Sequence, residues 1–150
     1  MNVTGILDGV ESHLKSLGIF DTVNMHEPKK APGSALHAAV WFQSSDPVPG
    51  LGGLNKTTTR LEFWIRVYLN MLSEPQDMID PNLMSAVDNM ISSFSGDFTL
   101  GGTVKMIDLM GAHGRGLSAQ AAYLDQDGKK FRAYVVRLPL IVDDVWTQTP

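Results

Sequence analysis

The stretch from residue 57 to residue 71, TTTRLEFWIRVYLNM, constrains the fold most, because apolar and polar side chains alternate along it. Its apolar positions are Leu61, Phe63, Ile65, Val67 and Leu69. A helix would scatter these side chains around its axis, whereas a strand places all of them on one face. The sequence therefore predicts a long strand with one face in the core.

The opposite face of this predicted strand mixes guanidinium and aromatic groups, at Arg60, Trp64, Arg66 and Tyr68. Arg and aromatic residues are enriched where proteins bind other proteins. A solvated sheet face, on which Arg stacks against aromatic neighbours, accounts for the same pattern. We treat these four residues as a candidate protein interface and keep the solvated face as the alternative.

The first 43 residues predict a helix followed by strands. Thr4 is the expected cap of a helix that ends at Gly18. The apolar stripe of this helix consists of Ile6, Val10, Leu14 and Leu17. Residues 20–27 alternate weakly and can form a short strand. Residues 35–43 are apolar at odd-numbered and even-numbered positions alike, which is typical of a strand that is covered on both faces or joined to a subunit partner.

Residues 44–56, SSDPVPGLGGLNK, are predicted to be a long hairpin loop, because their three Gly and two Pro disfavour helix and strand alike. Val48, Leu51 and Leu54 give this loop apolar side chains that a solvated loop does not need. We expect these three residues to contact an assembly partner and to contribute little to the fold.

A second helix is predicted after the long strand, with Asp80 as its cap, Pro81 as its first residue and Gly96 as its end. Its apolar face would consist of Leu83, Met84, Val87, Met90, Ile91 and Phe94. We expect this helix to lie across the apolar face of the long strand and to form half of the core.

The remaining chain predicts a strand over residues 103–110, a loop over 111–116 and a hairpin that turns at Asp127-Gly128. This turn pairs Leu124 with Phe131, Tyr123 with Arg132 and Ala122 with Ala133. Pro139 lacks an N–H and should mark an edge or the end of pairing. Residues 143–150 are expected to be a C-terminal tail with Trp146 as its only anchor.

These elements predict an α+β fold with a mixed, mainly antiparallel sheet, two helices packed on it and the order α-β-β-β-α-β-β-β. One domain spanning residues 1–150 is expected from the length. Without cysteine, the chain has no disulfide framework and no thiolate site. A net charge of -4 gives no general attraction to nucleic acid. We expect no signal peptide, no membrane span and production in the cytoplasm.

No residue pattern predicts catalysis, a cofactor or a metal. None of the four histidines has a spacing that makes a ligand pair. They are His13, His26, His37 and His113. Asp143-Asp144, and Asp77 with Asp80, lack further oxygen ligands, and the GAHGRG segment lacks the Lys and hydroxyl of a phosphate-binding loop. We therefore expect a protein that is not an enzyme.

Five segments resemble the tail terminator proteins of long-tailed, siphovirus-type bacteriophages, in particular those of phages that infect actinobacteria. The segments are MNVTGILDGVESHL, EPQDMIDPNL, SGDFTLGG, GAHGRGLSAQAAYLDQDGK and LPLIVDDVWTQ. The resemblance implies a structural virion protein, assembled in the host cytoplasm, that forms a hexameric ring on the head-proximal end of the tail tube. Its implied partners are its own copies, the tail tube protein and the head-tail connector proteins, and genomic DNA passes through the lumen. The family has no catalytic residues to transfer.

Two alternatives stay open at this stage. A head-completion or connector protein on the portal side of the neck would share the ring and bind a different partner. A small ligand-binding α+β domain would need polar groups that converge in a pocket.

Overall fold

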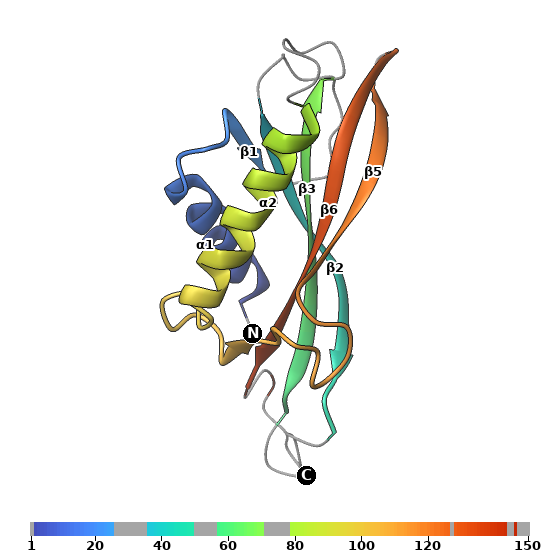
Figure 1. Cartoon of the computed structure of the whole chain (residues 1–150). Helices are drawn as coiled ribbons and strands as arrows, with labels where there is room; N and C mark the ends of the chain where they lie inside the picture. The colour runs from blue at the N-terminus through green and yellow to red at the C-terminus, as the bar shows by residue number, and fades with distance from the viewer. Residues whose placement is uncertain are drawn as a thin grey trace.

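The computed structural model describes residues 2–25, 36–49, 57–70, 79–126, 128–143 and residue 146. Two helices lie on one side of a six-stranded sheet, in the predicted order α-β-β-β-α-β-β-β (Figure 1). The strands neighbour one another in the order β1-β2-β3-β6-β4, and β5 also pairs with β6. Within the described residues only β1 and β2 are parallel. The predicted α+β class and mainly antiparallel mixed sheet are confirmed.

Helix α1 (Val3–Ser16) buries the predicted stripe of Ile6, Val10 and Leu14 against the sheet. Its cap is Asn2, whose side-chain oxygen accepts a hydrogen bond from the Gly5 N–H at 2.9 Å. The expected cap at Thr4 is wrong, because Thr4 lies inside the first turn. Gly18 follows the helix at φ +69°, the left-handed conformation that its position predicts.

The long strand, β3 (Thr59–Asn70), lies in the middle of the sheet between β2 (His37–Pro47) and β6 (Lys129–Val142). It pairs with β6 along its whole length, from Thr59↔Val142 to Asn70↔Phe131. All five alternating apolar side chains are buried in the main core, as predicted: Leu61, Phe63, Ile65, Val67 and Leu69. The period-two pattern therefore identified both the strand and its buried face.

Strand β2 is longer than predicted. It pairs with the three-residue strand β1 (Thr22–Asn24) at one end and continues past a bulge between Phe42 and Ser44 to Pro47. The expectation that residues 44–47 belong to a loop is wrong, because Pro47 lies at the outer edge of the sheet, where it interrupts no ladder hydrogen bond. Residues 50–56 of the predicted loop lie outside the described residues.

Helix α2 (Ile79–Gly96) packs across β3 and β6, as predicted. Leu83, Met90 and Phe94 are fully buried, and each such side chain contributes about 1.5–3 kcal/mol relative to an exposed one. The helix begins at Ile79, so Asp80 lies in the first turn and is not the expected cap. Met84 is also mispredicted, because 58% of its surface is exposed.

The predicted strand over residues 103–110 is wrong except for β4 (Met106–Ile107). Residues 97–105 form successive turns, since the Asp97 carboxylate accepts a hydrogen bond from Gly101 N and the Thr99 hydroxyl accepts one from Gly102 N. These local bonds compete with an extended backbone. The chain reaches the sheet only where Lys105 N donates to the Ile141 carbonyl.

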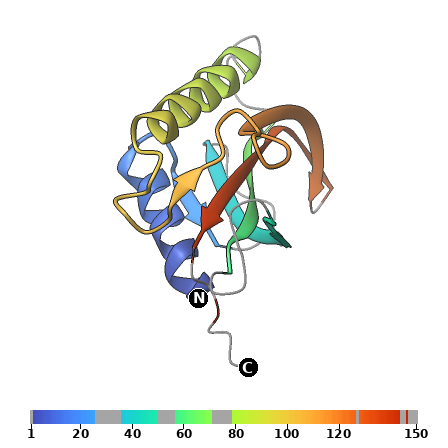
Figure 2. The same ribbon diagram turned by 90° about the horizontal axis from the view of Figure 1, so that it is seen from below.

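The hairpin of β5 (Ser118–Gln126) and β6 has the predicted register, with Leu124 opposite Phe131 and Ala122 opposite Ala133. It bends around the face opposite the helices (Figure 2). Pro139 ends neither β6 nor its pairing with β3. Its missing N–H faces the gap between β5 and β4, since its carbonyl accepts from Asp108 N on that side.

The tail beyond β6 is held differently from the prediction. The Trp146 indole is 57% exposed, and the backbone of this residue makes the contact, through its N–H and C=O to the Thr57 hydroxyl, each at 2.9 Å. Asp143 is a second anchor, bonded to Thr58 at 2.7 Å and to Lys105 at 2.8 Å. Residues 144, 145 and 147–150 lie outside the described residues. No described helix is long and apolar enough to cross a membrane.

Candidate protein interface on the open face of the sheet

The two helices cover one face of the sheet (Figure 1). The predicted Arg and aromatic residues alternate along β3 with its core residues, so their side chains point to the opposite face. One end of that opposite face is closed by a second, smaller core. This core consists of Ala39, Tyr68, Leu124, Phe131 and Ala133, with Trp41 packed against it. It forms because the β5–β6 hairpin bends over β2 and β3, which removes that end of the face from solvent.

Tyr68 belongs to this second core and is 1% exposed, so the expectation of an exposed Tyr68 is wrong. Its ring stacks on His37 and meets the edge of Phe131. Burial raises the pKa of the Tyr68 hydroxyl above its ordinary value, against smaller opposing effects of a hydrogen bond to Asn24 and of the nearby Arg66. Tyr68 is a core residue in this chain.

The middle of the open face carries four half-buried side chains that we call the Trp–Arg ladder: Trp41, Trp64, Arg66 and Arg137. Trp41 and Trp64 are cross-strand partners and meet edge to face, with ring centres 6.4 Å apart. The guanidinium carbon of Arg66 lies 5.3 Å from the Trp41 ring, and that of Arg137 lies 5.0 Å from the Trp64 ring. Each Arg is thus held over an aromatic face, where the cation is attracted by the ring.

The ladder also carries a polar group that the fold does not satisfy. The Trp64 Nε1–H is shielded from solvent and has no hydrogen-bond acceptor among the described residues. A buried donor without an acceptor costs about 1–3 kcal/mol. A partner could bond this N–H only after a ladder side chain moves, so it is the residue types of the ladder, two Trp and two Arg, that are typical of a contact surface.

Arg137 was missed by sequence reasoning, although it completes the ladder. Its place opposite Trp64 follows from the β3–β6 register, which joins residues 73 positions apart. The β5–β6 turn predicts how β6 pairs with β5, and it contains no information about how β6 pairs with β3. The alternation of β6 alone indicates only that Arg137 shares a face with Val135 and Ala133.

Arg60 lies on the same face as the ladder but serves a different purpose. It is buried, its Nε lies 3.6 Å from Oδ2 of the buried Asp108, and its Nη2 donates to the Arg115 carbonyl. The Asp108 carboxylate also accepts from Ala112 N at 2.8 Å and from His113 N at 3.0 Å. The expectation that Arg60 is available to a partner is therefore not supported.

The Arg60–Asp108 pair fixes the predicted loop over residues 111–116 against the sheet. Gly114 lies against the Arg60 guanidinium at φ +147°, and an added Cβ there would be 2.9 Å from Arg60 Cζ. The Gly-rich sequence of this loop thus reflects close packing on an arginine.

The loop residues of the predicted interface divide into two groups. Val48 is 4% exposed and its N–H donates to the Thr58 carbonyl at 3.0 Å. The expectation that Val48 contributes little to the fold is wrong, because β2 and β3 extend up to this residue and enclose it. Leu51 and Leu54 lie outside the described residues.

The described histidines make structural contacts. His13 on α1 stacks on Phe94 of α2 and hydrogen-bonds Ser93 Oγ through Nε2 at 2.8 Å. Burial lowers the pKa of His13, and the charge of Asp97 opposes this effect. His37 Nδ1 lies 2.6 Å from the Thr22 hydroxyl, and His113 is exposed. The part of the chain that the structure describes contains no group of three potential metal ligands.

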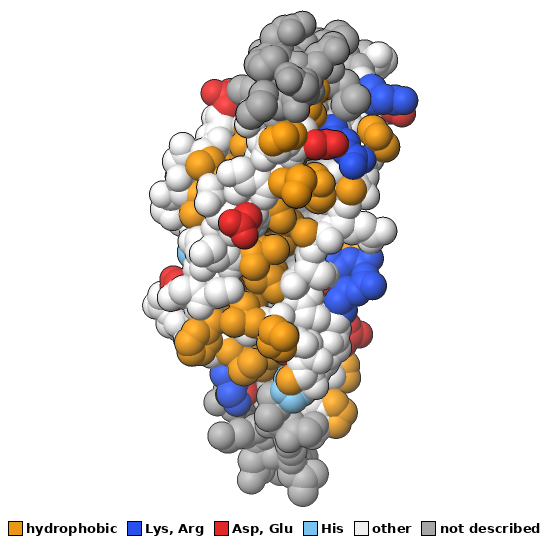
Figure 3. Space-filling model, viewed as in Figure 1, with side chains coloured by type: hydrophobic (Ala, Val, Ile, Leu, Met, Phe, Trp, Pro, Cys, Tyr) orange, Lys and Arg blue, Asp and Glu red, His pale blue; other side chains and the backbone are white. Residues whose placement is uncertain are grey.

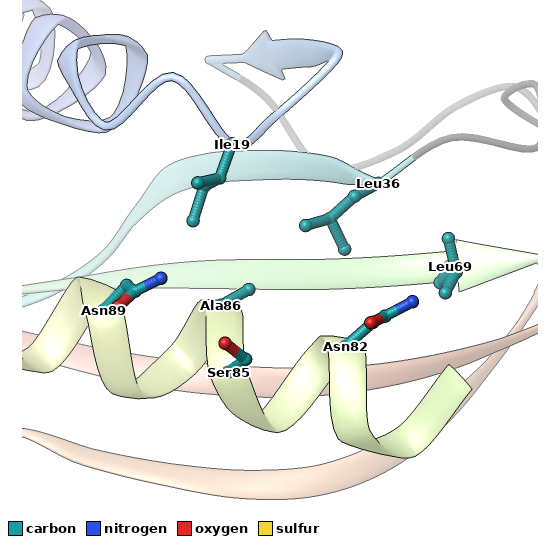
Figure 4. A pocket seen from close by; sticks show the side chains of 7 residues that line it. All are labelled: Ile19, Leu36, Leu69, Asn82, Ser85, Ala86 and Asn89. Atoms are coloured by element: carbon teal, nitrogen blue, oxygen red, sulfur yellow. The ribbon is translucent and has the colours of Figure 1, made fainter. Parts of the chain in front are cut away.

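A cleft of about 280 Å³ lies on the other side of the sheet, between α2 and the start of β2 (Figure 4). Its walls are Ile19, Leu36, Leu69, Asn82, Ser85, Ala86 and Asn89. The polar members all come from one surface of α2, and no titratable side chain is among them. This arrangement lacks the convergence of polar groups from several elements that fixes a small ligand.

The helix-covered side also carries apolar surface, in a band along α2 and its border with β5 and β6 (Figure 3). Met84 on α2 and Tyr123 on β5 are among the exposed large apolar side chains of these segments. At the same border Arg132 bonds Asp80 at 3.0 Å, and this hydrogen bond raises the pKa of Arg132.

The chain matches no protein-family model, and no curated protein sequence is significantly similar to it.

Proposed function

We propose that this protein is a structural tail protein of a long-tailed bacteriophage that forms a ring on the head-proximal end of the tail tube. The observation that carries the proposal is the open sheet face, where the Trp–Arg ladder presents two indoles and two guanidinium groups. Surfaces rich in Trp and Arg are typical of protein contacts.

The resemblance to tail terminators supports this role. The observed order of helices and strands, α-β-β-β-α-β-β-β, also fits that family. The described residues of the resembling segments lie in α1, the start of α2, the turns after it, the 111–116 loop with β5, and both ends of β6. They contribute to both helices and to the β5–β6 hairpin, and they do not include β1, β2 or β3.

In this role the protein binds other virion proteins and catalyses no reaction. Six copies would close a ring that ends tube polymerisation and offers a surface to the head-tail connector proteins. Genomic DNA would pass through the lumen without sequence-specific binding, and the protein would reside in the virion at the head-proximal end of the tail.

A polymerisation assay with the tail tube protein of the same phage tests the proposal. The protein, added during tube growth, should bind one end of each tube and stop elongation. The variant Arg137→Glu should fold but lose capping, because it replaces a ladder cation with an anion. Lys15→Glu, on the exposed surface of α1, is the matched control and should cap normally.

Two outcomes would contradict the proposal. Tubes that grow to the same length with and without the protein would exclude a terminator. Binding to the connector on the portal side, with no binding to tube ends, would favour the head-completion alternative instead.

A further inference from the structure

Strand β5 is an open sheet edge without the usual protection. It pairs with β6 on one side, and no described strand pairs with its other side. Natural edge strands are protected by Pro, Lys, bulges or short length. Over its nine residues, SAQAAYLDQ, β5 has no Pro and no Lys, its single charge is Asp125 near the turn, and its pairing with β6 contains no bulge. Such an edge is a template for another strand.

The direction of each backbone group on β5 follows from the ladder. In an antiparallel pair, alternate residues direct their N–H and C=O to alternate sides. The Pro139 and Ile141 carbonyls accept bonds from the β4 side, so the odd residues of β6 face β4 and β5. Their partners on β5 are even-numbered. The odd residues of β5 therefore direct their backbone groups to the open edge: Ala119, Ala121, Tyr123 and Asp125.

We infer that β5 receives the β1 edge of a second copy of this chain, so that the sheets of neighbouring copies join into one continuous ring. The inference rests on the proposed ring and identifies its subunit joint. A rung is a row of residues that are paired from strand to strand across the sheet. One rung consists of Val23, Ala38, Val67, Tyr134 and Ala121. A rotation about an axis along the strands places Val23 of the next copy beside Ala121, where this rung ends.

The strand directions agree with this joint. Strands β1 and β2 run in one direction, β3 in the other, β6 returns and β5 reverses again. The same rotation preserves these directions, so β5 meets the next β1 antiparallel. The contact is head to tail, and such contacts form a closed ring when the rotation between neighbouring copies completes a circle.

The other edge of the sheet is formed by β1 and, further along, by β2, and only the β2 part carries side chains and a bulge that disfavour strand addition. At the level of β5 the outer strand is β1, which carries neither Pro nor a bulge. Further along, where β2 itself is the edge, the bulge after Phe42, the charge of Asp46 and Pro47 disfavour strand addition. The open β5 edge and the β1 edge, whose protection is its short length alone, therefore lie on the same rows of paired residues across the sheet.

Side chains match across the joint on both faces. On the helix-covered face, Val23 of one copy meets Ala121, which is small and exposed. On the opposite face, Asn24 lies on the rung that ends at Gln120. Five strands about 4.8 Å apart in each of six copies give a circumference of roughly 145 Å, which leaves a central opening roughly 45 Å across between opposing backbones.

Amide hydrogen exchange on the free protein and on the protein assembled on tube ends tests the joint. The Ala121 amide should exchange at least about tenfold more slowly in the assembly, because it gains an acceptor on Val23 of the next copy. Amides of Gln120 and Ala122 already bond β6 and should change little. This alternation is specific for an added strand, since simple burial would slow neighbouring amides alike.

Two variants of Ala121 complete the test. Ala121→Pro removes one outward N–H and should leave a folded monomer that binds tube ends weakly and forms no closed ring. Ala121→Thr keeps the N–H and should assemble normally. Rings that form with Ala121→Pro, or uniform protection along β5, would overturn the joint while the terminator function stands. A protein that neither binds tubes nor associates would overturn the function as well.

Discussion

Replacing Asp108 with Asn should destabilise the fold more than any other isosteric change among the described residues. The carboxylate is 1% exposed, pairs with Arg60 and accepts two backbone N–H groups of the 111–116 loop. Asp108→Asn leaves the Arg60 charge buried without its partner, which costs about 3–5 kcal/mol. The new Asn side chain would also place its NH₂ group against the N–H of Ala112 or His113, where two donors face each other and no hydrogen bond forms.

Urea unfolding followed by circular dichroism measures this loss. With a slope of about 1–3 kcal/mol per M for a small protein, the midpoint should fall by roughly 2 M. Asp88→Asn, on the exposed surface of α2, should change stability by less than about 0.5 kcal/mol. Adding Arg60→Met to Asp108→Asn should recover part of the loss. A loss below about 1 kcal/mol for Asp108→Asn would refute the argument that this buried pair holds the loop.

Three further changes have defined outcomes. Gly114→Ala should destabilise by about 1–3 kcal/mol, because its φ of +147° disfavours other residues and the new Cβ would press on Arg60; an unchanged melting midpoint would contradict this packing. Asn2→Ala should lose about 1 kcal/mol and the exposed Thr4→Ala should not, and equal losses in urea unfolding would refute the cap assignment. His13 has a lowered folded-state pKa, so the unfolded chain binds its proton more readily, and the stability it contributes above pH 6.5 should be lost as the pH falls. His13→Gln should flatten the fall in melting midpoint between pH 7.5 and 5.5, and parallel curves would exclude this role.

Local patterns predicted the elements whose stability comes from their own residues. Strand β3 is recognisable from its own alternation, which places one apolar face in the core. The β5–β6 hairpin is recognisable from Asp127-Gly128, which connects its strands by two residues. The stripe of α1 likewise predicted its buried side.

The predictions fail where contacts with residues far away in the sequence determine whether a side chain is buried or what it binds. The burial of Tyr68 depends on how far the β5–β6 hairpin bends, and the role of Arg60 depends on Asp108, 48 positions away. Pro47 extends β2 because it lies at the sheet edge, a position that the sequence of β2 alone does not indicate. Of the predicted interface, Trp64 and Arg66 remain in the Trp–Arg ladder, while Arg60, Tyr68 and Val48 serve the fold.

Imaging of assembled tails by cryo-electron microscopy tests the central claim most directly. We predict one sixfold layer of this protein at the head-proximal end of each tail tube, with neighbouring copies joined edge to edge through β5. Tails that end at the tube protein itself, with this protein absent from that position, would contradict it.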